Sequence, residues 1–257
     1  MINICFFVKN KFTILIFFSK SKPFLKDLIP SDYVDIHSHL LPGIDDGSKS
    51  IEDTKSLINS LKDIGFNRFI TTPHIMEGVW ENNRSIIIEN AAKTNRQLIE
   101  EQIELKAAAE YMLDGNFLKI LSSEKLLTLK DHYVLVEMSY LNPPMNLFDI
   151  IFEIQLEGYT PILAHPERYN FYHSSLSDYT KLKTAGCKFQ INMLSTVGYY
   201  GPHVAKASDY LITNNLIDFI GSDVHHNKHI EFMKNKIVLK KHESLNSIFQ
   251  NNSVFRF

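Results

Sequence analysis

The sequence predicts one α/β domain in which seven parallel strands close into a barrel, with helices around it. Short apolar runs recur along the chain at intervals of roughly thirty residues, the length of one strand–helix–strand unit. Nearly every run ends in a polar residue capable of chemistry. An open doubly wound sheet, the alternative for alternating strands and helices, concentrates its site at one switch point. A barrel collects functional residues from many strand ends, so the barrel is favoured.

The predicted strands are near-continuous apolar runs, as expected for strands buried on both faces of a parallel sheet. In chain order they read YVDIHSH (33–39), NRFITTPH (67–74), ELKAAAEY (104–111), HYVLVEMS (132–139), TPILAHPE (160–167), KFQINM (188–193) and IDFIGSDVH (217–225). Seven such units predict a barrel with one strand fewer than the usual eight.

Helices are predicted between the strands, where apolar residues recur at helical spacing. They cover residues 50–66, 83–102, 145–159, 177–187 and 202–217. The first begins with a capping pattern, Ser50 followed three residues later by Asp53, and Gly65 lies near its end.

Composition excludes several classes of protein. The chain has 257 residues, 44% of them hydrophobic, which is enough for one sizeable core. A formal net charge of -2 predicts no binding to nucleic acid. The two cysteines, Cys5 and Cys187, imply no disulfide framework, so a reducing, cytoplasmic setting is expected.

Two strand ends carry paired metal-ligand types. Alternate residues of a strand point the same way, so His37 and His39 are expected to project together, as are Asp223 and His225. An isolated pair of this kind is often only a capped strand end with a solvent-exposed histidine. Other strand ends, however, add His74, Glu110, Glu137 and His165.

Imidazole and carboxylate together suit zinc, manganese or iron. Glu110 and Glu137 have an alternative interpretation as salt-bridge partners, and His165 as a satisfied core histidine. Buried carboxylates are costly unless cations neutralise them. The recurrence at separate strand ends therefore predicts a multinuclear metal centre.

Arg168 adds a candidate phosphate ligand, because it follows His165 by three residues and a guanidinium binds phosphate oxygens bidentately. The alternative is a surface arginine paired with Glu167. Adjacent divalent ions lower the pKa of a bound water and stabilise displacement at phosphorus. Cys187 is followed by KFQINM, which lacks the arginine of a thiol-based phosphatase, and P-loop and GxSxG motifs are absent from the sequence.

The ordered motifs HSH, TTPH, AAEY, VEMS, AHPERY and GSDVHH resemble the polymerase and histidinol phosphatase (PHP) superfamily. IDDG and AHPERY make the chain most similar to its bacterial metal-dependent protein-tyrosine phosphatases of capsule and exopolysaccharide synthesis. The resemblance runs from about Tyr33 to His226. It implies a distorted (β/α)7 TIM-like barrel and hydrolysis of phosphotyrosine by a metal-activated water. It also implies a phosphotyrosine protein as partner, such as a bacterial tyrosine kinase of polysaccharide export.

The resemblance further implies three divalent ions per chain. Manganese is the favoured metal, and iron and zinc are the alternatives. His37, His39, Glu110 and Asp223 would hold the first. Glu110 would bridge to a second, held with Glu137 and His165, and a third would lie between Asp46, His74 and His225. Asp46 is favoured over Asp45 by its spacing from His37. Arg168 matches the family's phosphate-binding arginine and, with Asp223 and His225, makes up the expected catalytic set.

One departure from the family pattern concerns a second arginine after the last DxH motif. The corresponding loop, HNKHIEFMKNK, has none, and its candidate substitutes are Lys228, His229 and Lys234. Two alternative functions therefore stay open. One is a small-molecule phosphomonoesterase such as a histidinol-phosphate phosphatase, and the other is a non-catalytic metal-binding scaffold.

Residues 1–30 are predicted to be a leader or extension, for which disorder is one interpretation, ahead of a phosphatase domain over 31–257. The apolar run 12–18 is shorter than the roughly 20 residues of a membrane helix, and no small-x-small cleavage site follows it. Peripheral membrane association through this segment is the alternative. Deletion of residues 1–20 is expected to leave metal content and turnover unchanged.

Overall fold

The computed structural model describes residues 4–5, 8–9, 12–13, 16–17 and 21–257. Near the N-terminus, β1 (Ile4–Cys5) pairs with β4 (Ile16–Phe17), and β2 (Val8–Lys9) pairs with β3 (Phe12–Thr13), both antiparallel. The other residues up to 20 in the predicted leader lie outside the described residues. The expectation that residues 1–20 are dispensable stays a prediction.

The body of the molecule is a ring of parallel strands. These are β5 (Val34–Asp35), β6 (Arg68–Thr71), β7 (His74–Ile75), β8 (Leu105–Ala107), β9 (Glu110–Met112), β10 (Tyr133–Glu137), β11 (Thr160–Ala164), β12 (Lys188–Asn192) and β13 (Phe219–Gly221). One sheet has the order β5-β6-β8 and the other β13-β12-β11-β10-β9-β7. Two residues separate β6 from β7 and β8 from β9, so each pair is one interrupted strand that belongs to both sheets.

Contacts between the first and last strands close the ring. A parallel bridge joins Ser38 to Val224, and the backbone N–H of Asp223 donates to the carbonyl oxygen of His37 at 2.8 Å. Beside them, the buried Asp35 carboxylate accepts hydrogen bonds from the backbone N–H (2.9 Å) and hydroxyl (2.6 Å) of Ser222. The predicted barrel of seven parallel strands is therefore confirmed, and the two interruptions distort it.

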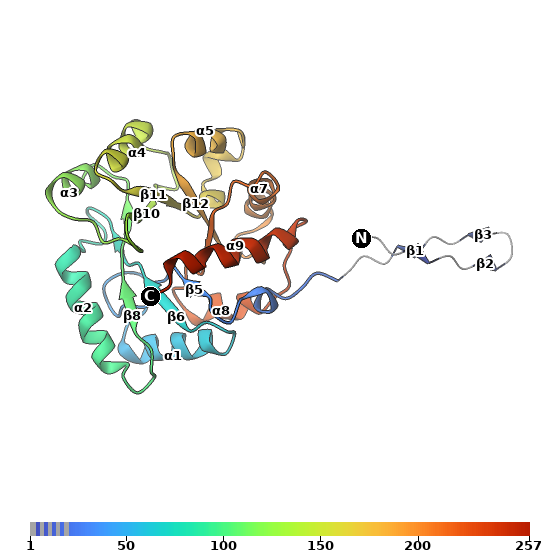
Figure 1. The fold of residues 1–257 in the computed structure, drawn as a ribbon, viewed down its shortest axis with the longest axis horizontal. Coiled ribbons are helices and arrows are strands. Elements are labelled where there is room, and N and C mark those ends of the chain that lie inside the picture. The colour runs from blue at the N-terminus through green and yellow to red at the C-terminus, as the bar shows by residue number, and fades with distance from the viewer. Residues whose placement is uncertain (1–3, 6–7, 10–11, 14–15, 18–20) are drawn as a thin grey trace.

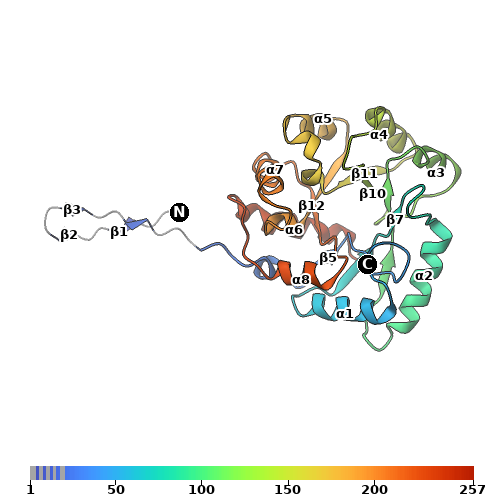
Figure 2. The same cartoon turned by 180° about the vertical axis from the view of Figure 1, so that it is seen from behind.

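Helices surround the strands, as Figures 1 and 2 show from opposite sides. They are α1 (Ile51–Lys62), α2 (Arg84–Gln97), α3 (Phe117–Ser123), α4 (Leu147–Leu156), α5 (Asp178–Thr184), α6 (Met193–Thr196), α7 (Pro202–Thr213), α8 (Asn227–Met233) and α9 (Leu245–Asn251). Short 3-10 turns add η1 (Leu25–Leu28), η2 (Pro166–Arg168), η3 (Asn170–Tyr172), η4 (His242–Ser244) and η5 (Asn252–Phe255). The five predicted helices correspond to α1, α2, α4, α5 and α7. The others have seven residues or fewer, too short to show a helical period in the sequence.

Local signals explain where α1 starts and stops. The Ser50 side chain accepts a hydrogen bond from the backbone N–H of Asp53 at 3.2 Å, which satisfies one of the free donors of the first turn. Gly65 adopts a φ of 106°, a left-handed conformation that favours glycine, as the chain leaves the helix. Both predicted signals are confirmed.

The inside of the barrel changes character along the strands. Near their N-terminal ends lies an apolar cluster that includes Val34, Ile70, Leu135 and Ile162, all fully buried. Because side chains alternate along a strand, Leu135 and Glu137 of β10 face the same side. The interior is therefore apolar at one end and carries acids and imidazoles at the other.

The C-terminal segment seals the apolar end. Helix α9 crosses in front of the strands in Figure 1 and lies behind them in Figure 2. The amide of buried Asn252 donates to the carbonyl oxygens of Val34 (2.9 Å) and Ile220 (2.7 Å). Phe255 is fully buried, and its ring centroid lies 4.9 Å from that of Phe219. Water is thus kept from this end of the barrel.

Residues just before the predicted domain start also pack on the barrel. Leu25 of η1 is fully buried, and its backbone N–H donates to the carbonyl oxygen of Asn235 at 3.0 Å. The carbonyl oxygen of Pro23 accepts from the backbone N–H of Ile237 at 3.0 Å. The boundary between residues 30 and 31 stays a prediction, with packed residues on both sides of it.

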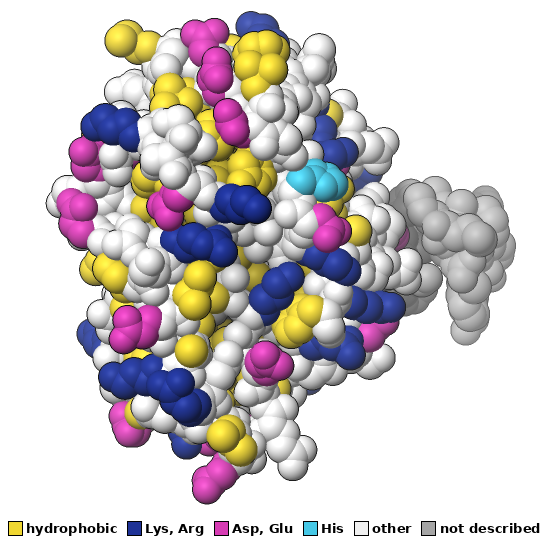
Figure 3. Space-filling view, turned by 60° about the vertical axis from the view of Figure 1, so that its left-hand side comes forward, with side chains coloured by type: hydrophobic (Ala, Val, Ile, Leu, Met, Phe, Trp, Pro, Cys, Tyr) yellow, Lys and Arg dark blue, Asp and Glu magenta, His cyan; other side chains and the backbone are white. Residues whose placement is uncertain are grey.

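The outer surface mixes charges of both signs. On the face drawn in Figure 3, Lys and Arg side chains are interspersed with Asp and Glu, and apolar side chains lie exposed between them. This face therefore carries no broad field of one sign. In the described part of the chain, no helix combines the length and the apolar character that crossing a membrane requires.

We predict that Phe255→Ala lowers the free energy of unfolding by about 3 kcal/mol, because it removes a buried ring and leaves a cavity. The neighbouring Val254 is 44% exposed, so Val254→Ala is the matched control and should change stability by less than about 0.5 kcal/mol. Chemical denaturation of both variants measures the difference. Equal stabilities would contradict the sealing role of Phe255.

Candidate metal centre

The nine side chains predicted as metal ligands meet at the open, C-terminal end of the barrel. Their potential ligand atoms form four groups, in each of which all atoms lie within 4.8 Å of one another. The groups are His37, His39 and Asp223; His37, Glu110 and His165; His74, Glu110 and Glu137; and His39, Asp46, His74 and His225. Residues nearly 190 positions apart in the chain thus share one site.

The HSH motif supplies the first group. The Nε2 atoms of His37 and His39 lie 3.3 Å apart, and each lies 3.3 Å from Oδ1 of Asp223. The two imidazoles therefore project together, as their spacing predicts. Glu110, the fourth residue expected here, has its Oε2 3.1 Å from Nε2 of His37.

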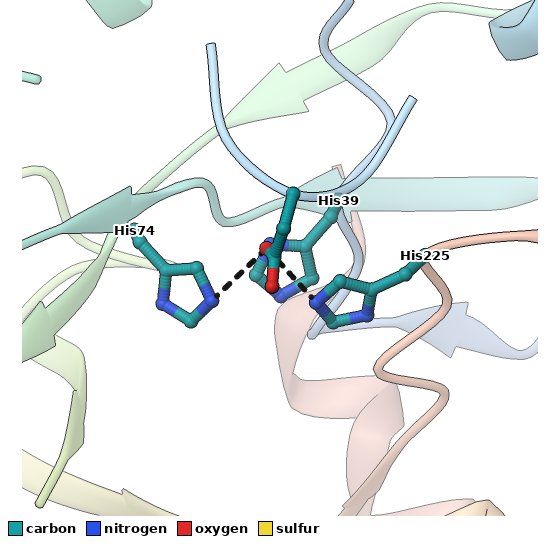
Figure 4. Close-up of side chains that lie close together, drawn as sticks. His39, His74 and His225 are labelled. Atoms are coloured by element: carbon teal, nitrogen blue, oxygen red, sulfur yellow. Dashed lines mark ion pairs between the residues drawn. The ribbon is translucent and has the colours of Figure 1, made fainter. Parts of the chain in front are cut away.

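A second group lies nearer the surface. Oδ1 of Asp46 lies 3.5 Å from Nε2 of His74 and 3.3 Å from Nε2 of His225, and these ion pairs are the dashed lines in Figure 4. The ring of His39 stacks on that of His225, with centroids 3.9 Å apart. Asp46 belongs to this group and its neighbour Asp45 does not.

Glu110 lies at the centre of the site. Its Oε2 is 3.1 Å from His37 and 3.2 Å from His74, and its Oε1 is 3.2 Å from Nε2 of His165. Glu137 is 2.7 Å from Nδ1 of His74 but 4.0 Å from His165. The trio expected to share a middle ion is therefore divided between two groups, with Glu110 common to both.

Two of these side chains depend on unusual backbone. His165 and Asp223 have positive φ values, 35° and 52°, at the ends of β11 and β13. Few residues other than glycine adopt this region, and such strain concentrates at functional sites. Each turn directs a metal-ligand side chain into the barrel mouth.

The charge balance fits divalent ions. Burial alone would raise the pKa of Glu110 and Asp223, but the neighbouring imidazoles, chiefly His37, hold both well below the ordinary values. Conversely, burial lowers the pKa of His39, and Asp45 and Asp223 more than reverse this. The site therefore favours ionised carboxylates with positive charge beside them. Divalent ions bound here would supply that charge.

Two buried carboxylate oxygen atoms also indicate a cation site. Oε1 of Glu110 and Oε1 of Glu137 are buried, and although imidazole nitrogens lie 3.2 Å and 2.7 Å from them, no described residue is aligned to donate a hydrogen bond to either oxygen. A buried carboxylate oxygen without a donor costs free energy unless a cation coordinates it. This donor set of imidazole and carboxylate suits manganese, iron or zinc.

Outer contacts fix the orientation of the imidazoles. Nδ1 of His39 lies 2.7 Å from Oδ2 of Asp45, and Nδ1 of His37 lies 2.8 Å from Oε1 of Gln190. Such partners set which ring nitrogen is free to bind a metal, here Nε2. Sequence reasoning did not find Gln190, although a polar residue within the apolar run KFQINM was a signal.

The metal-ligand cluster opens into a cavity of about 640 Å³. Its floor includes His74, Glu137, His165, Asp223 and His225. The rest of its lining is mainly apolar and aromatic, with Met76, Trp80, Met112, Tyr140, Leu141 and Pro143, and it also includes the carboxylates of Glu77 and Asp114. A flat apolar group attached to an anion therefore matches the shape and chemistry of the cavity.

Arg168 lines this cavity and does not pair with Glu167. Its Nη1 donates to Oδ2 of Asp223 at 2.7 Å, and its guanidinium lies 4.9 Å and 4.3 Å from the ring centroids of Tyr140 and Tyr200. Glu167 is fully buried elsewhere, accepting hydrogen bonds from Asn192 and Ser195. The alternative of an exposed Arg168–Glu167 pair is therefore wrong.

The candidate substitutes for the second arginine lie away from the cavity. His229 is buried, and its Nδ1 accepts from the backbone N–H of His225 at 3.3 Å. Lys234 pairs with Glu231 at 2.8 Å, and Lys228 is exposed. Among the described residues that line the cavity, Arg168 is the only lysine or arginine.

We predict that Asp45→Asn weakens metal binding about ten- to a hundredfold, because the amide keeps the shape but not the charge that orients His39. Asp63→Asn removes an exposed carboxylate at the end of α1 and is the matched control. Competition with a chelator, measured for manganese and zinc, gives the affinities. Equal affinities for the two variants would show that Asp45 has no such role.

The chain is similar to known proteins over most of its length. Residues 33–253 match the family model described as capsular polysaccharide synthesis, CpsB/CapC. The chain is 33% identical over 198 residues to tyrosine-protein phosphatase YwqE of Bacillus subtilis, covering 76% of this chain and 78% of that protein. It is 29% identical over 195 residues to the putative tyrosine-protein phosphatase CapC of Staphylococcus aureus, covering 75% and 76%.

Solved structures of known proteins are also similar to this chain. One, from a study of YwqE from Bacillus subtilis and CpsB from Streptococcus pneumoniae as metal-dependent tyrosine phosphatases, has a TM-score of 0.76. Its sequence identity is 28%, over 86% of this chain and 93% of that one. A histidinol phosphate phosphatase from Lactococcus lactis shares the fold alone, with a TM-score of 0.52 and 11% identity, over 86% and 94%. The chain belongs to the CpsB/CapC family of capsular polysaccharide synthesis.

Proposed function

We propose that this protein is a metal-dependent protein-tyrosine phosphatase that regulates polysaccharide synthesis or export in the cytoplasm. Family membership supports this proposal, and one observation carries it. The cavity combines a carboxylate–imidazole floor with apolar and aromatic walls that include Trp80 and Tyr140. A phosphate on the floor would leave an attached tyrosyl ring against these walls.

We propose that each chain binds three divalent ions. Manganese is the favoured metal, and iron and zinc are the alternatives. The support is the grouping of the ligand atoms: one group around Asp223, one around Asp46, and a central pair of groups that share Glu110. When bound, such ions lower the pKa of water and stabilise the charge that develops on a transferring phosphoryl group.

The chain's own residues bind and orient the substrate in this proposal. Arg168 supplies a charge-assisted contact to the phosphate oxygens, and its position is fixed by Asp223 and by the rings of Tyr140 and Tyr200. Asp223 and His225 line the cavity beside it, so they face the same phosphate. The aromatic walls exclude water from the ring side of the substrate.

The physiological substrate in this proposal is a phosphotyrosine protein, such as a tyrosine kinase of polysaccharide export. A small-molecule phosphatase is the rival. The aromatic walls favour an aryl leaving group, whereas Glu77 and Asp114, which also line the cavity, favour a cationic one such as histidinol, so the two substrates are compared directly. A non-catalytic scaffold is the other rival, and the complete ligand set argues against it.

The test is hydrolysis of a phosphotyrosine peptide and of histidinol phosphate by the full chain, before and after exhaustive chelation. We expect a higher kcat/KM for the peptide, lost on chelation and restored by manganese. Activity that survives chelation would contradict the metal dependence. Bound metal without turnover of either substrate would favour the scaffold.

We predict that Arg168→Ala lowers kcat/KM for phosphotyrosine about ten- to a hundredfold, the equivalent of one charge-assisted hydrogen bond. Metal content should stay unchanged, because Nδ2 of Asn192 also holds Oδ2 of Asp223 at 2.7 Å. His165→Ala, in contrast, should lower both metal content and rate. Arg168→Lys should restore activity only in part, since a point charge cannot reproduce the planar guanidinium.

The matched control is Arg96→Ala, which removes an exposed arginine of α2. Elemental analysis and steady-state kinetics on the four variants separate the two roles. Wild-type kcat/KM in Arg168→Ala would refute phosphate binding by this residue and leave the metal ligands untouched.

A further inference from the structure

A groove lies next to the cavity, between the loop that follows β10 and the start of α5. We call it the flank groove. Its volume is about 630 Å³, and it is lined by Asn142, Pro143, Pro144, Met145, Leu147, Phe148, Tyr172, Asp178 and Lys181. Helices α4 and α5 are neighbours in Figures 1 and 2.

The flank groove and the cavity share a wall. Asn142, Pro143 and Pro144 line both. Consecutive prolines have restricted backbone torsions, so this rim is largely preformed. A polypeptide that crosses the rim with its phosphotyrosine in the cavity therefore reaches the flank groove.

Exposed apolar side chains in the flank groove have no structural explanation. Helix α4 already packs inward through Ile150, Ile151 and Ile154, all nearly fully buried. On the outer side, where a surface helix normally carries polar residues, Phe148 is 49% exposed, and Met145 just before the helix is fully exposed. Apolar surface of this kind beside a catalytic cavity marks a binding site.

The charges in the flank groove balance each other, so its ligand is expected to be uncharged there. Lys181 forms an ion pair with Asp178 at 2.8 Å, so neither attracts a charged partner strongly. Apart from Asn142, the rest of the lining is apolar or aromatic and suits an apolar side chain. The flank groove is continuous with the cavity at the rim. This continuity favours a segment of the substrate as the ligand over a second copy of the chain, whose binding would not require contact with the cavity.

We propose that the flank groove binds the substrate polypeptide beside its phosphotyrosine, through an apolar substrate side chain that contacts Met145 and Phe148. This inference rests on the proposed function and adds a sequence preference to it: apolar residues within a few positions of the phosphotyrosine. Met145 and Phe148 are then specificity residues that touch the substrate protein but not its phosphate.

The experiment compares the wild-type full chain with Phe148→Ser. Phe152→Ser is the matched control, because Phe152 is 58% exposed one turn further along α4 and does not line the flank groove. The substrates are a phosphotyrosine peptide flanked on both sides by leucine, the same peptide flanked by serine, and p-nitrophenyl phosphate. Binding of the corresponding non-hydrolysable phosphonate peptides is measured by fluorescence anisotropy.

We expect Phe148→Ser to raise KM and Kd for the leucine peptide about tenfold, the scale of one lost apolar contact. Its kcat, and its kcat/KM for p-nitrophenyl phosphate and for the serine peptide, should match the wild type. Phe152→Ser should behave as wild type throughout.

Equal Kd values of wild type and Phe148→Ser for the leucine peptide would overturn the proposal. So would an equal loss on p-nitrophenyl phosphate, which would place the effect in the cavity itself. If Phe148→Ser instead abolishes a dimer seen by sedimentation without changing Kd, the surface is an interface between copies. If the wild type hydrolyses nothing, the proposed function fails, while the ratio of Kd values still decides whether the flank groove binds peptide.

Discussion

The rest of the structure depends on the burial of ionised carboxylates at one end of the barrel. Glu110 is fully buried, with nitrogens of three imidazoles within 3.2 Å of its carboxylate. Asp223 lies 3.3 Å from the imidazoles of His37 and His39 and pairs with Arg168 at 2.7 Å. Uncompensated, either carboxylate would destabilise the fold by several kcal/mol. The cluster of histidines is therefore a condition for folding in this arrangement as well as a set of candidate metal ligands.

This constraint explains the polarity of the barrel interior. Charges can be gathered at one end only if the other end excludes water, because the protein core that surrounds the carboxylates strengthens each ion pair. The C-terminal turn η5 provides that exclusion by placing Phe255 beneath Phe219 and by bonding Asn252 to the first and last strands. A segment far from the site in sequence thus contributes to its electrostatics.

Most of the fold and the site were predictable because their signals are local. Apolar runs of strand length predict the seven strands, and ligand types at strand ends predict eight of the nine clustered side chains. The ninth, Asp46, was expected only from the family resemblance. The contacts that the sequence did not predict join residues far apart in the chain, and the helices that it did not predict are short. Glu167 adjoins Arg168 in sequence, yet its carboxylate faces Ser195, and the arginine faces Asp223. Helices such as α6 are too short for a period, and the role of the C-terminal segment required knowing which end of the barrel was open.

The loop after β10 connects catalysis to recognition. Tyr140 at its start stacks on the guanidinium of Arg168, and Pro143 and Pro144, three and four residues later, form the rim shared by the cavity and the flank groove. A substrate polypeptide resting on the rim would therefore contact the segment that positions Arg168, the proposed phosphate ligand. A small aryl phosphate reaches Arg168 without that contact. In the proposed arrangement, residues beside the phosphotyrosine contribute binding energy equally before and during phosphoryl transfer, so they lower KM and Kd and leave kcat unchanged.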